Sequence, residues 1–273
     1  MDPLWLAGFC ALGVAVGAYG TLIGAGGGFL IVPVLLLGLH WPHDRAVGTS
    51  LVVVSANALS GSIAYARKKR IDYRTGWVFA VATIPGAIAG STVVQALSGR
   101  AFSTIFGAFL VIVSTYLLLR PDPRGKAGAA VERPSGPLGW GFVVRHIVDR
   151  EGTVFDYGFS MPWGIALSFV VGFLSSILGI GGGIVHVPAL VTVFGFPAHV
   201  ATATSHFILA ISAATGSVSH YALGHVDVVP AAAMAAGAIV GAQIGGALSS
   251  RIHGRWIIRG LALALGLVGL RLA

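Results

Sequence analysis

The chain has 273 residues, of which 56% are hydrophobic and only 10% are charged. With a mean hydropathy of +0.88, this composition excludes a water-soluble globular protein and predicts one embedded in a lipid bilayer. The net charge of +8 does not indicate nucleic acid as a partner, because the basic residues gather in short stretches between apolar runs. A single cysteine, Cys10, excludes an internal disulfide framework and a cysteine-based metal site, so we expect no cofactor and no metal.

Apolar segments follow one another along the chain, and a segment of about 20 residues crosses a hydrocarbon core of about 30 Å as a helix. The first set is expected at 4–23, 29–39, 47–66, 76–97 and 102–119. The second set is expected at 161–178, 184–195, 201–223, 228–249 and 256–272. We therefore predict an all-α polytopic membrane protein with a first membrane repeat at 1–119, a cytoplasmic linker at 120–160 and a second membrane repeat at 161–273. Within the linker, Leu138 to Val148 are expected on the membrane surface.

The two sets of segments are related by an internal duplication, because a constant shift of 155 positions aligns them without a gap. The aligned glycines are Gly24, Gly26, Gly27 and Gly28 with Gly179, Gly181, Gly182 and Gly183. The same shift pairs Pro33 with Pro188, Ala46 with Ala201, Thr49 with Thr204, Ser50 with Ser205 and Asp72 with Asp227. Compositional bias explains scattered glycine matches but not this joint run, so we predict two repeats of about five hydrophobic segments each.

The basic residues indicate the orientation of the chain in the membrane. Of the 17 Lys and Arg residues, 14 lie in three stretches, at 67–75, 120–158 and 250–259. Short loops rich in Lys and Arg face the cytoplasm, so we expect these stretches inside and both termini outside, in the inner membrane of the cell. The repeat partner of the first basic loop, at 222–230, has no Lys or Arg. This difference predicts that the two repeats are inverted relative to each other.

The glycine-rich motifs at 24–28 and 179–183 each lie between a long apolar segment and an unusually short one. Successive glycines cost a helix roughly 1 kcal/mol each relative to alanine, so we predict a broken or re-entrant helix at each motif. A helix that restarts after the break presents free N–H groups and a partial positive charge, which suit an anion. The alternative is that the glycines only allow close helix packing. We predict a substrate site between the repeats that includes Gly26, Gly27, Gly28, Gly181, Gly182 and Gly183.

Polar residues on the segments that follow the two breaks point to the same site. The candidates are Thr49, Ser50 and Asn57 in the first half and Thr204, Ser205 and His206 in the second. Hydroxyl, amide and imidazole groups within a span can donate hydrogen bonds to an oxyanion, so all six are predicted to bind substrate. The alternative is that such groups bond to their own helix or join helices together. Protonation of His186, His206 or His220 could also couple substrate movement to protons.

The run G-x-G-G-G-x4-P followed by A-x-x-T-S, which occurs twice, resembles the TauE/SafE family of sulfite exporters in the sulfonate uptake permease superfamily. The resemblance covers nearly the whole chain. It implies a secondary transporter of small sulfur-containing anions such as sulfite, sulfonates or thiosulfate, with alternating access around a site between the two repeats. Beyond the anionic substrate and the lipid bilayer, it leaves open two partners: a coupling ion, either proton or sodium, and a second copy of the chain in a homodimer.

Other functions compete with this one. An intramembrane enzyme would need clustered acid–base groups or metal ligands, and the chain has no H-E-x-x-H, no G-x-S-x-G and no paired carboxylates within its apolar segments. We therefore predict that the protein is not an enzyme. An anion channel, or a carrier of a different small organic anion, would use the same glycine and helix-terminus physics, and the sequence does not separate these from a carrier of sulfur anions.

Overall fold

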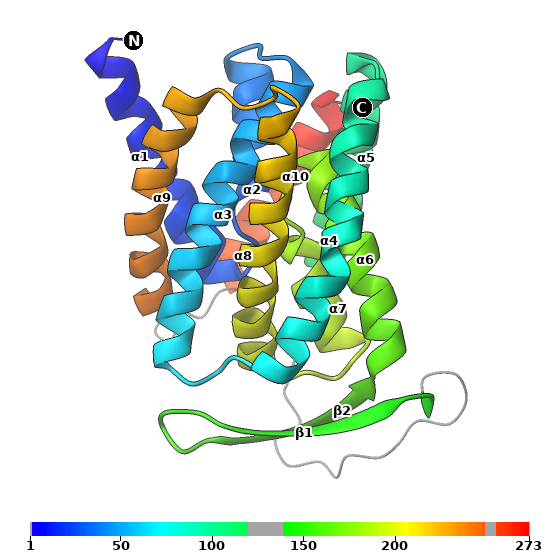
Figure 1. The fold of residues 1–273 in the computed structure, drawn as a ribbon. Coiled ribbons are helices and arrows are strands. Elements are labelled where there is room, and N and C mark those ends of the chain that lie inside the picture. Colours follow the sequence, from blue (N-terminus) through cyan, green and yellow to red (C-terminus); the bar gives the residue numbers. More distant parts are fainter. Residues whose placement is uncertain (1, 120–138, 249–254, 273) are drawn as a thin grey trace.

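The computed structural model describes residues 2–119, 139–248 and 255–272 of the chain. Within these ranges the helices stand side by side in one bundle, and a β-hairpin lies across one end of it (Figure 1). The first half comprises α1 (Pro3–Ile23), α2 (Gly28–Pro33), the π-helical turn η1 (Val34–Gly38), α3 (His43–Arg67), α4 (Tyr73–Ala96) and α5 (Gly99–Leu119). The hairpin comprises β1 (Phe142–Val148) and β2 (Val154–Ser160). The second half comprises α6 (Met161–Leu178), α7 (Gly183–Thr192), α8 (Ala198–Ala222), α9 (Val228–Leu248) and α10 (Arg255–Leu272).

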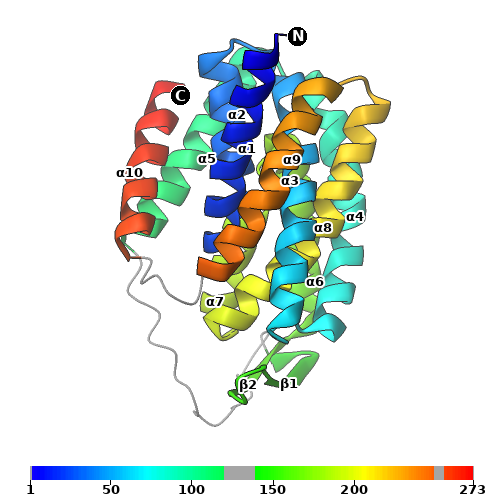
Figure 2. The ribbon, with the colours of Figure 1, turned by 90° about the vertical axis from the view of Figure 1, so that its left-hand side faces the viewer.

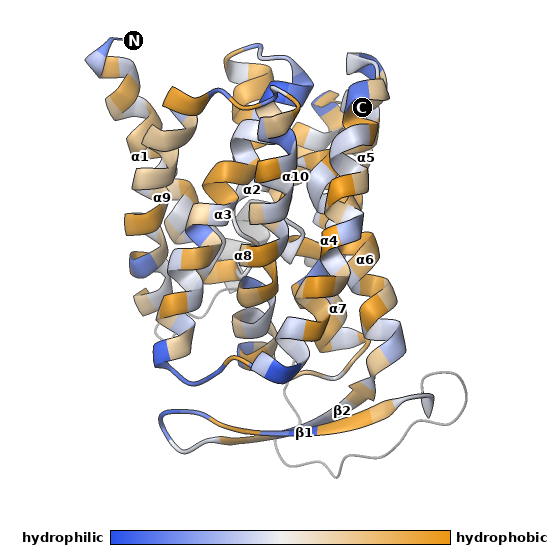
Figure 3. Cartoon of the chain, viewed as in Figure 1, coloured by the Kyte–Doolittle hydropathy of each residue, from blue (hydrophilic) through white to orange (hydrophobic). Residues whose placement is uncertain are grey.

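The apolar segments expected from the sequence are helical, and their ends lie within a few residues of the predicted positions. Six of the described helices are long and apolar enough to cross a membrane, namely α1, α3, α4, α5, α6 and α9. Apolar residues cover much of the bundle (Figure 3), and large side chains such as Leu59, Val81 and Ile112 are exposed on it. Such a surface suits lipid rather than water, which confirms the prediction of a polytopic helical membrane protein.

Helix pairs from the two halves form the bundle. The helix α1 packs against α9, and α6 packs in the same way against α4. At the first pair Gly13 and Gly17 approach the backbone of Met234 and Ala238, because a glycine leaves room for the neighbouring chain. The long helices α3 and α8 contact each other, and α5 packs against α10. A shift of 155 positions maps α1 onto α6 and α4 onto α9, so the α1–α9 pair and the α6–α4 pair are counterparts.

The prediction of an all-α protein is wrong for the end of the linker, which forms a two-stranded antiparallel hairpin. The β1 segment is rich in β-branched Val and Ile, which favour an extended chain, and Gly152 turns the chain with a φ of 82°. Pairs such as His146 with Asp156 fix the register. The stretch expected on the membrane surface is therefore mostly a strand, apart from Leu138, which lies outside the described residues, as does the rest of the linker at 120–137.

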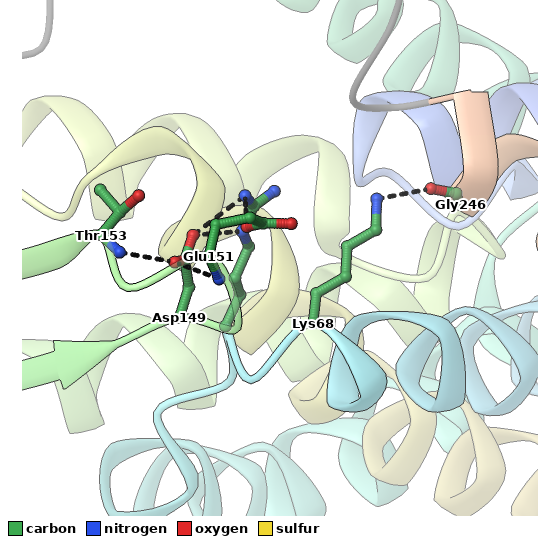
Figure 4. A network of polar contacts seen from close by, with 6 residues as sticks. Lys68, Asp149, Glu151, Thr153 and Gly246 are labelled. Carbon is green, nitrogen blue, oxygen red and sulfur yellow. Dashed lines mark hydrogen bonds and ion pairs between the residues drawn. The ribbon is translucent and has the colours of Figure 1, made fainter.

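Ionic contacts attach the hairpin to the loop between α3 and α4 (Figure 4). The Arg70 guanidinium lies 3.0 Å from Asp149 Oδ2 and 2.7 Å from Glu151 Oε2. Burial alone would raise the pKa of Asp149, but the amide of Thr153 and the guanidinium of Arg70 outweigh it and lower that pKa. Lys68 in the same loop donates a hydrogen bond to the Gly246 carbonyl in α9. The hairpin therefore lies at the end of the bundle where α3 joins α4.

Both chain termini lie at the opposite end of the bundle from the hairpin (Figures 1 and 2). The loop between α8 and α9, at residues 223–227, lies at the end with the termini, whereas the loop between α3 and α4, at residues 68–72, lies at the hairpin end. The two loops occupy corresponding places in the sequence repeat. They are thus on opposite ends of the bundle.

Candidate functional site

The two glycine motifs interrupt the helices, as predicted from the sequence. Gly24, Gly26 and Gly27 have φ values of 87°, 77° and 88°, and their counterparts Gly179, Gly181 and Gly182 have values of 68°, 82° and 73°. Only glycine adopts this left-handed backbone at little cost, so the motif determines the break. The apolar helices that follow, at Gly28–Gly38 and Gly183–Thr192, are much shorter than the roughly 20 residues needed to cross a membrane.

The two breaks are in direct contact with each other. A Cβ atom added at Gly28 would overlap the carbonyl oxygen of Gly179, and one added at Gly183 would overlap the carbonyl oxygen of Gly24. We call the point where the two breaks touch the crossing. Val54 of α3 and Leu209 of α8 enclose it, because Cβ atoms at Gly26 or Gly181 would meet both side chains. The crossing therefore joins the start of α2 with the start of α7, and no room is left for a side chain at Gly28 or Gly183.

The backbone amides at the crossing are the groups with unused hydrogen-bonding capacity. Within the described part of the chain, the amides of Gly27, Gly28, Gly181 and Gly182 donate no hydrogen bond. These amides precede or open the short helices, where the first N–H groups have no partner within the helix. Each helix start also carries a partial positive charge of about half a unit. The arrangement can hold a small anion without a charged side chain.

Ser50 and Asn57 bind the carbonyl side of the breaks. The Ser50 hydroxyl donates to the Gly179 carbonyl at 2.8 Å, and the Asn57 side-chain amide donates to the Gly26 carbonyl at 2.9 Å. Thr21, in the last turn of α1, donates to the Asn57 side-chain oxygen at 2.9 Å. These hydrogen bonds stabilise the backbone conformation of both breaks.

Thr49 and Thr204 make a matched pair of contacts with loops. The Thr49 hydroxyl accepts a hydrogen bond from the Asp227 amide at 3.1 Å, and the Thr204 hydroxyl accepts one from the Asp72 amide at 3.0 Å. Asp72 and Asp227 come directly before α4 and α9. The two hydroxyls therefore join α3 and α8 to the starts of these helices, and each keeps its own proton for a further hydrogen bond.

Ser205 and His206 are buried and have no hydrogen-bond partner among the residues that the structure describes. Ser205 Oγ and both ring nitrogens of His206 lack a partner, as do the hydroxyls of Ser175 and Ser212. The Thr202 carbonyl, one turn earlier, interacts with the His206 ring without meeting hydrogen-bond geometry. An unpaired polar group in the interior costs about 1–3 kcal/mol, so such groups need an explanation.

The surroundings of His206 indicate that its polarity is not needed for packing. The ring packs over Gly61, where an added Cβ would lie 2.7 Å from His206 Cδ2, and edge-on to Tyr65 with ring centres 5.3 Å apart. In the other half, Leu51 occupies the corresponding place and packs over Gly216. A hydrocarbon side chain thus suffices for the same contact. The imidazole adds two nitrogen atoms for which the described part of the chain supplies no hydrogen bond.

Sequence reasoning missed the residues just before the breaks, Thr21 and Ser175. Thr21 completes the contacts of Asn57, and Ser175 adds another unpaired hydroxyl next to the second break. The sequence held a signal for Thr21, because Thr21 and its repeat partner Ser176 are both hydroxyl residues in the last turn of a helix that ends at the glycine motif. It held none for Ser175, whose repeat partner is Gly20.

The interrupted helices and the unpaired amides between them, in an apolar bundle, are features of membrane transport proteins. The chain belongs to the TauE/SafE sulfite exporter family: the sequence profile described as "Sulfite exporter TauE/SafE" matches residues 9–272.

Two named relatives are similar to the chain over most of their length. The chain is 37% identical to the "Probable membrane transporter protein YunE" of Bacillus subtilis, over 96% of this chain and 94% of that protein. It is 26% identical to the "Probable membrane transporter protein MJ0441" of Methanocaldococcus jannaschii, over 95% of this chain and 92% of that protein. A shorter match, 37% identical over 29% of this chain and 18% of the other, is to "Sulfite exporter TauE/SafE family protein 6" of Arabidopsis thaliana. No solved structure matches the chain significantly.

Proposed function

We propose that the protein is a secondary transporter of small sulfur-containing anions such as sulfite, sulfonates or thiosulfate, which bind at the crossing of the two breaks. The observation that carries this proposal is the contact between the starts of α2 and α7, with four glycine amides that lack a partner in the described chain. Amides at helix starts bind oxyanions well. The family, described as sulfite exporters, suggests the sulfur chemistry.

The donors around the crossing suit a small oxyanion. On α8, one turn before Leu209, Ser205 and His206 add a hydroxyl and an imidazole that have no hydrogen-bond partner among the described residues. The described side chains that meet the breaks are apolar, like Val54 and Leu209, or neutral and polar, like Ser50. An anion held by neutral donors avoids the cost of burying a second charge, and it can leave again. Thr49 and Thr204 stay candidate ligands, because each hydroxyl has a proton to donate.

We further propose that the two halves are inverted repeats and that the site opens alternately to the two sides. Reciprocal contacts support this: Thr49 with Asp227 corresponds to Thr204 with Asp72. The overlap of Gly28 with Gly179 likewise corresponds to that of Gly183 with Gly24. The two short helices then re-enter the membrane from opposite sides. Rocking of one half against the other about this crossing would expose the anion to each side in turn.

Orientation in the membrane can be tested with single cysteines in a Cys10→Ser background. Arg67→Cys at the end of α3 and Glu151→Cys in the hairpin turn are both exposed positions, as is Leu223→Cys in the opposite loop. In intact cells an impermeant maleimide is expected to label only the cysteine at 223, since the basic loops face the cytoplasm. The other two should react only after the membrane is permeabilised. Labelling of 67 and 223 from the same side would contradict the inverted repeat.

Binding of the proposed anions can be tested by thermal stability of the purified protein in detergent. A ligand of the native state raises the melting temperature by mass action, and at 100 times Kd it contributes about 2.7 kcal/mol. We expect at least one of sulfite, thiosulfate, sulfoacetate or isethionate to stabilise the protein, at constant ionic strength and pH. Chloride, sulfate and acetate serve as comparisons. Stabilisation by acetate alone, with none from any of the four, would argue against a site for sulfur anions.

A further inference from the structure

A chain of titratable side chains runs from one end of the bundle to the last turn before the second break. His220, near the end of α8, is fully buried, and its Nε2 lies 3.0 Å from the carbonyl oxygen of Ser176. Its other ring nitrogen, Nδ1, lies 3.1 Å from Nδ1 of His225. Ser176 is three residues before Gly179. His220 therefore bonds the helix that leads into the second break.

These distances determine where the protons lie. A carbonyl oxygen only accepts, so His220 Nε2 must carry a hydrogen, and in the neutral ring Nδ1 is then an acceptor. His225 must in turn donate from its Nδ1. A neutral His225 consequently leaves its Nε2 unprotonated, and that atom lies 3.8 Å from Asp44 Oδ2 at the start of α3. The next proton added to this group of side chains therefore goes to His225 Nε2, beside a carboxylate.

Asp44, the outermost of these titratable side chains, reaches water. Asp44 has a side chain that is 32% exposed, whereas His225 is only 6% exposed overall. Burial lowers the pKa of His225, and His43 lowers it further, while Asp44 opposes both. The other charged pair at this end is Arg45 with Asp227, 3.5 Å apart. The net effect is a pKa below the usual histidine value, so His225 is mostly neutral near pH 7 and holds an added proton only transiently.

The first half of the molecule supplies an internal comparison. Tyr65 occupies the place that corresponds to His220, and its hydroxyl donates to the Thr21 carbonyl at 2.8 Å, as His220 does to Ser176. Arg70 corresponds to His225, and there it binds Asp149 and Glu151 of the hairpin. The hydrogen bond to the helix before the break thus needs only a donor, and a phenol supplies it. Two histidines in contact are present only at the end with the termini, within the described residues.

We propose that Asp44, His225 and His220 form a proton relay that couples anion transport to protons from the end of the bundle with the chain termini. The inference rests on the proposed transport function and specifies its coupling ion. A proton binds His225 Nε2, the Nδ1 proton of His225 moves to His220 Nδ1, and His225 is left neutral with its proton on Nε2. His220 becomes an imidazolium that still donates to Ser176. Its positive charge next to the second break favours an anion there, so anion and proton bind together.

The test measures proton movement and anion exchange in the same proteoliposomes. Vesicles with an internal pH dye report protons that enter with thiosulfate, and radiolabelled thiosulfate reports exchange. His220→Tyr, which copies the first half and keeps the donor to Ser176, is expected to reduce thiosulfate-linked proton entry by at least about tenfold. Exchange is measured at saturating thiosulfate, where weaker anion binding without the imidazolium matters little, and it should continue at a comparable rate. His225→Gln should act alike and guards against poor folding of the first variant. His146→Gln, an exposed hairpin histidine, is the matched control and should resemble the wild type.

The outcomes separate the relay from the transport function. Undiminished proton entry in both His220→Tyr and His225→Gln overturns the relay. Wild-type exchange of thiosulfate with no proton movement also overturns it and leaves the transport proposal standing. If the wild type exchanges neither thiosulfate nor sulfoacetate, the proposed function fails, and the relay fails with it.

Discussion

Replacing Gly28 or Gly183 by alanine is expected to reduce anion transport by at least about tenfold. A methyl group at either position would overlap a carbonyl oxygen of the other break, so the two helix starts must separate. Overpacking of this kind costs typically 1–3 kcal/mol, which a folded membrane protein can survive. The amides of both breaks would nevertheless be displaced from their positions around the anion. We expect uptake to fall by at least about tenfold in each variant, because misplacing donors around a bound charge is costly.

The measurement is uptake of radiolabelled thiosulfate into cells or proteoliposomes, normalised to the amount of protein in the membrane. Gly8→Ala and Gly38→Ala are the matched controls, because an added Cβ at Gly8 or Gly38 meets nothing within 4 Å. Both controls should transport at the wild-type rate. If Gly28→Ala and Gly183→Ala transport as well as these controls, the crossing is a packing contact and not a binding site.

Replacing His206 by leucine is expected to reduce anion affinity by about tenfold to a hundredfold, the loss of one hydrogen bond to a charged ligand. Leucine is the residue that the other half carries at the corresponding place, and Leu51 makes the same contact with a glycine there. The substitution should not lower the stability of the folded protein. Because the substitution removes two buried nitrogen atoms without partners, the melting temperature should stay the same or rise.

The combination of unchanged stability and lost affinity distinguishes a ligand-binding residue from a structural one. Concentration-dependent uptake gives the affinity, and thermal unfolding in detergent without substrate gives the stability. Ser168→Ala is a useful comparison, because the Ser168 hydroxyl donates to its own helix at Gly164. It should leave the affinity unchanged. A His206→Leu protein that unfolds at lower temperature but binds with normal affinity would assign His206 to the fold alone.

The helical part of the fold follows from the sequence, because apolar periodicity is continuous there and glycine at positive φ marks each break. The hairpin does not. The strand at Phe142–Val148 is as apolar as a short helix, and its pairing with Val154–Ser160 depends on a turn between two segments in an otherwise polar stretch. The hairpin is stabilised by contacts with Arg70, a residue more than 70 positions earlier in the chain. No local sequence pattern predicts these contacts.

For the candidate site, the sequence predicted the position of the breaks but not the partners of individual side chains. Thr49 and Ser50 are neighbours in the chain, yet one contacts the Asp227 amide and the other the Gly179 carbonyl. Residue type gives both the same donor and acceptor capacity, so only the packing of three helices decides between them. Likewise, His206 and His220 look equivalent in the sequence, whereas one has no partner and the other has two.

Exchange of labelled thiosulfate or sulfoacetate by the purified wild-type protein in proteoliposomes tests the central claim most directly. A transporter with a single site that opens alternately should show saturable uptake that is accelerated by the same unlabelled anion on the opposite side. Gly183→Ala protein in the same vesicles should exchange the anion at least about tenfold more slowly. The account would be contradicted by exchange of carboxylates but of no sulfur anion. Uptake that does not saturate, passes a current and ignores the anion on the far side would contradict it equally, because that is the behaviour of a channel.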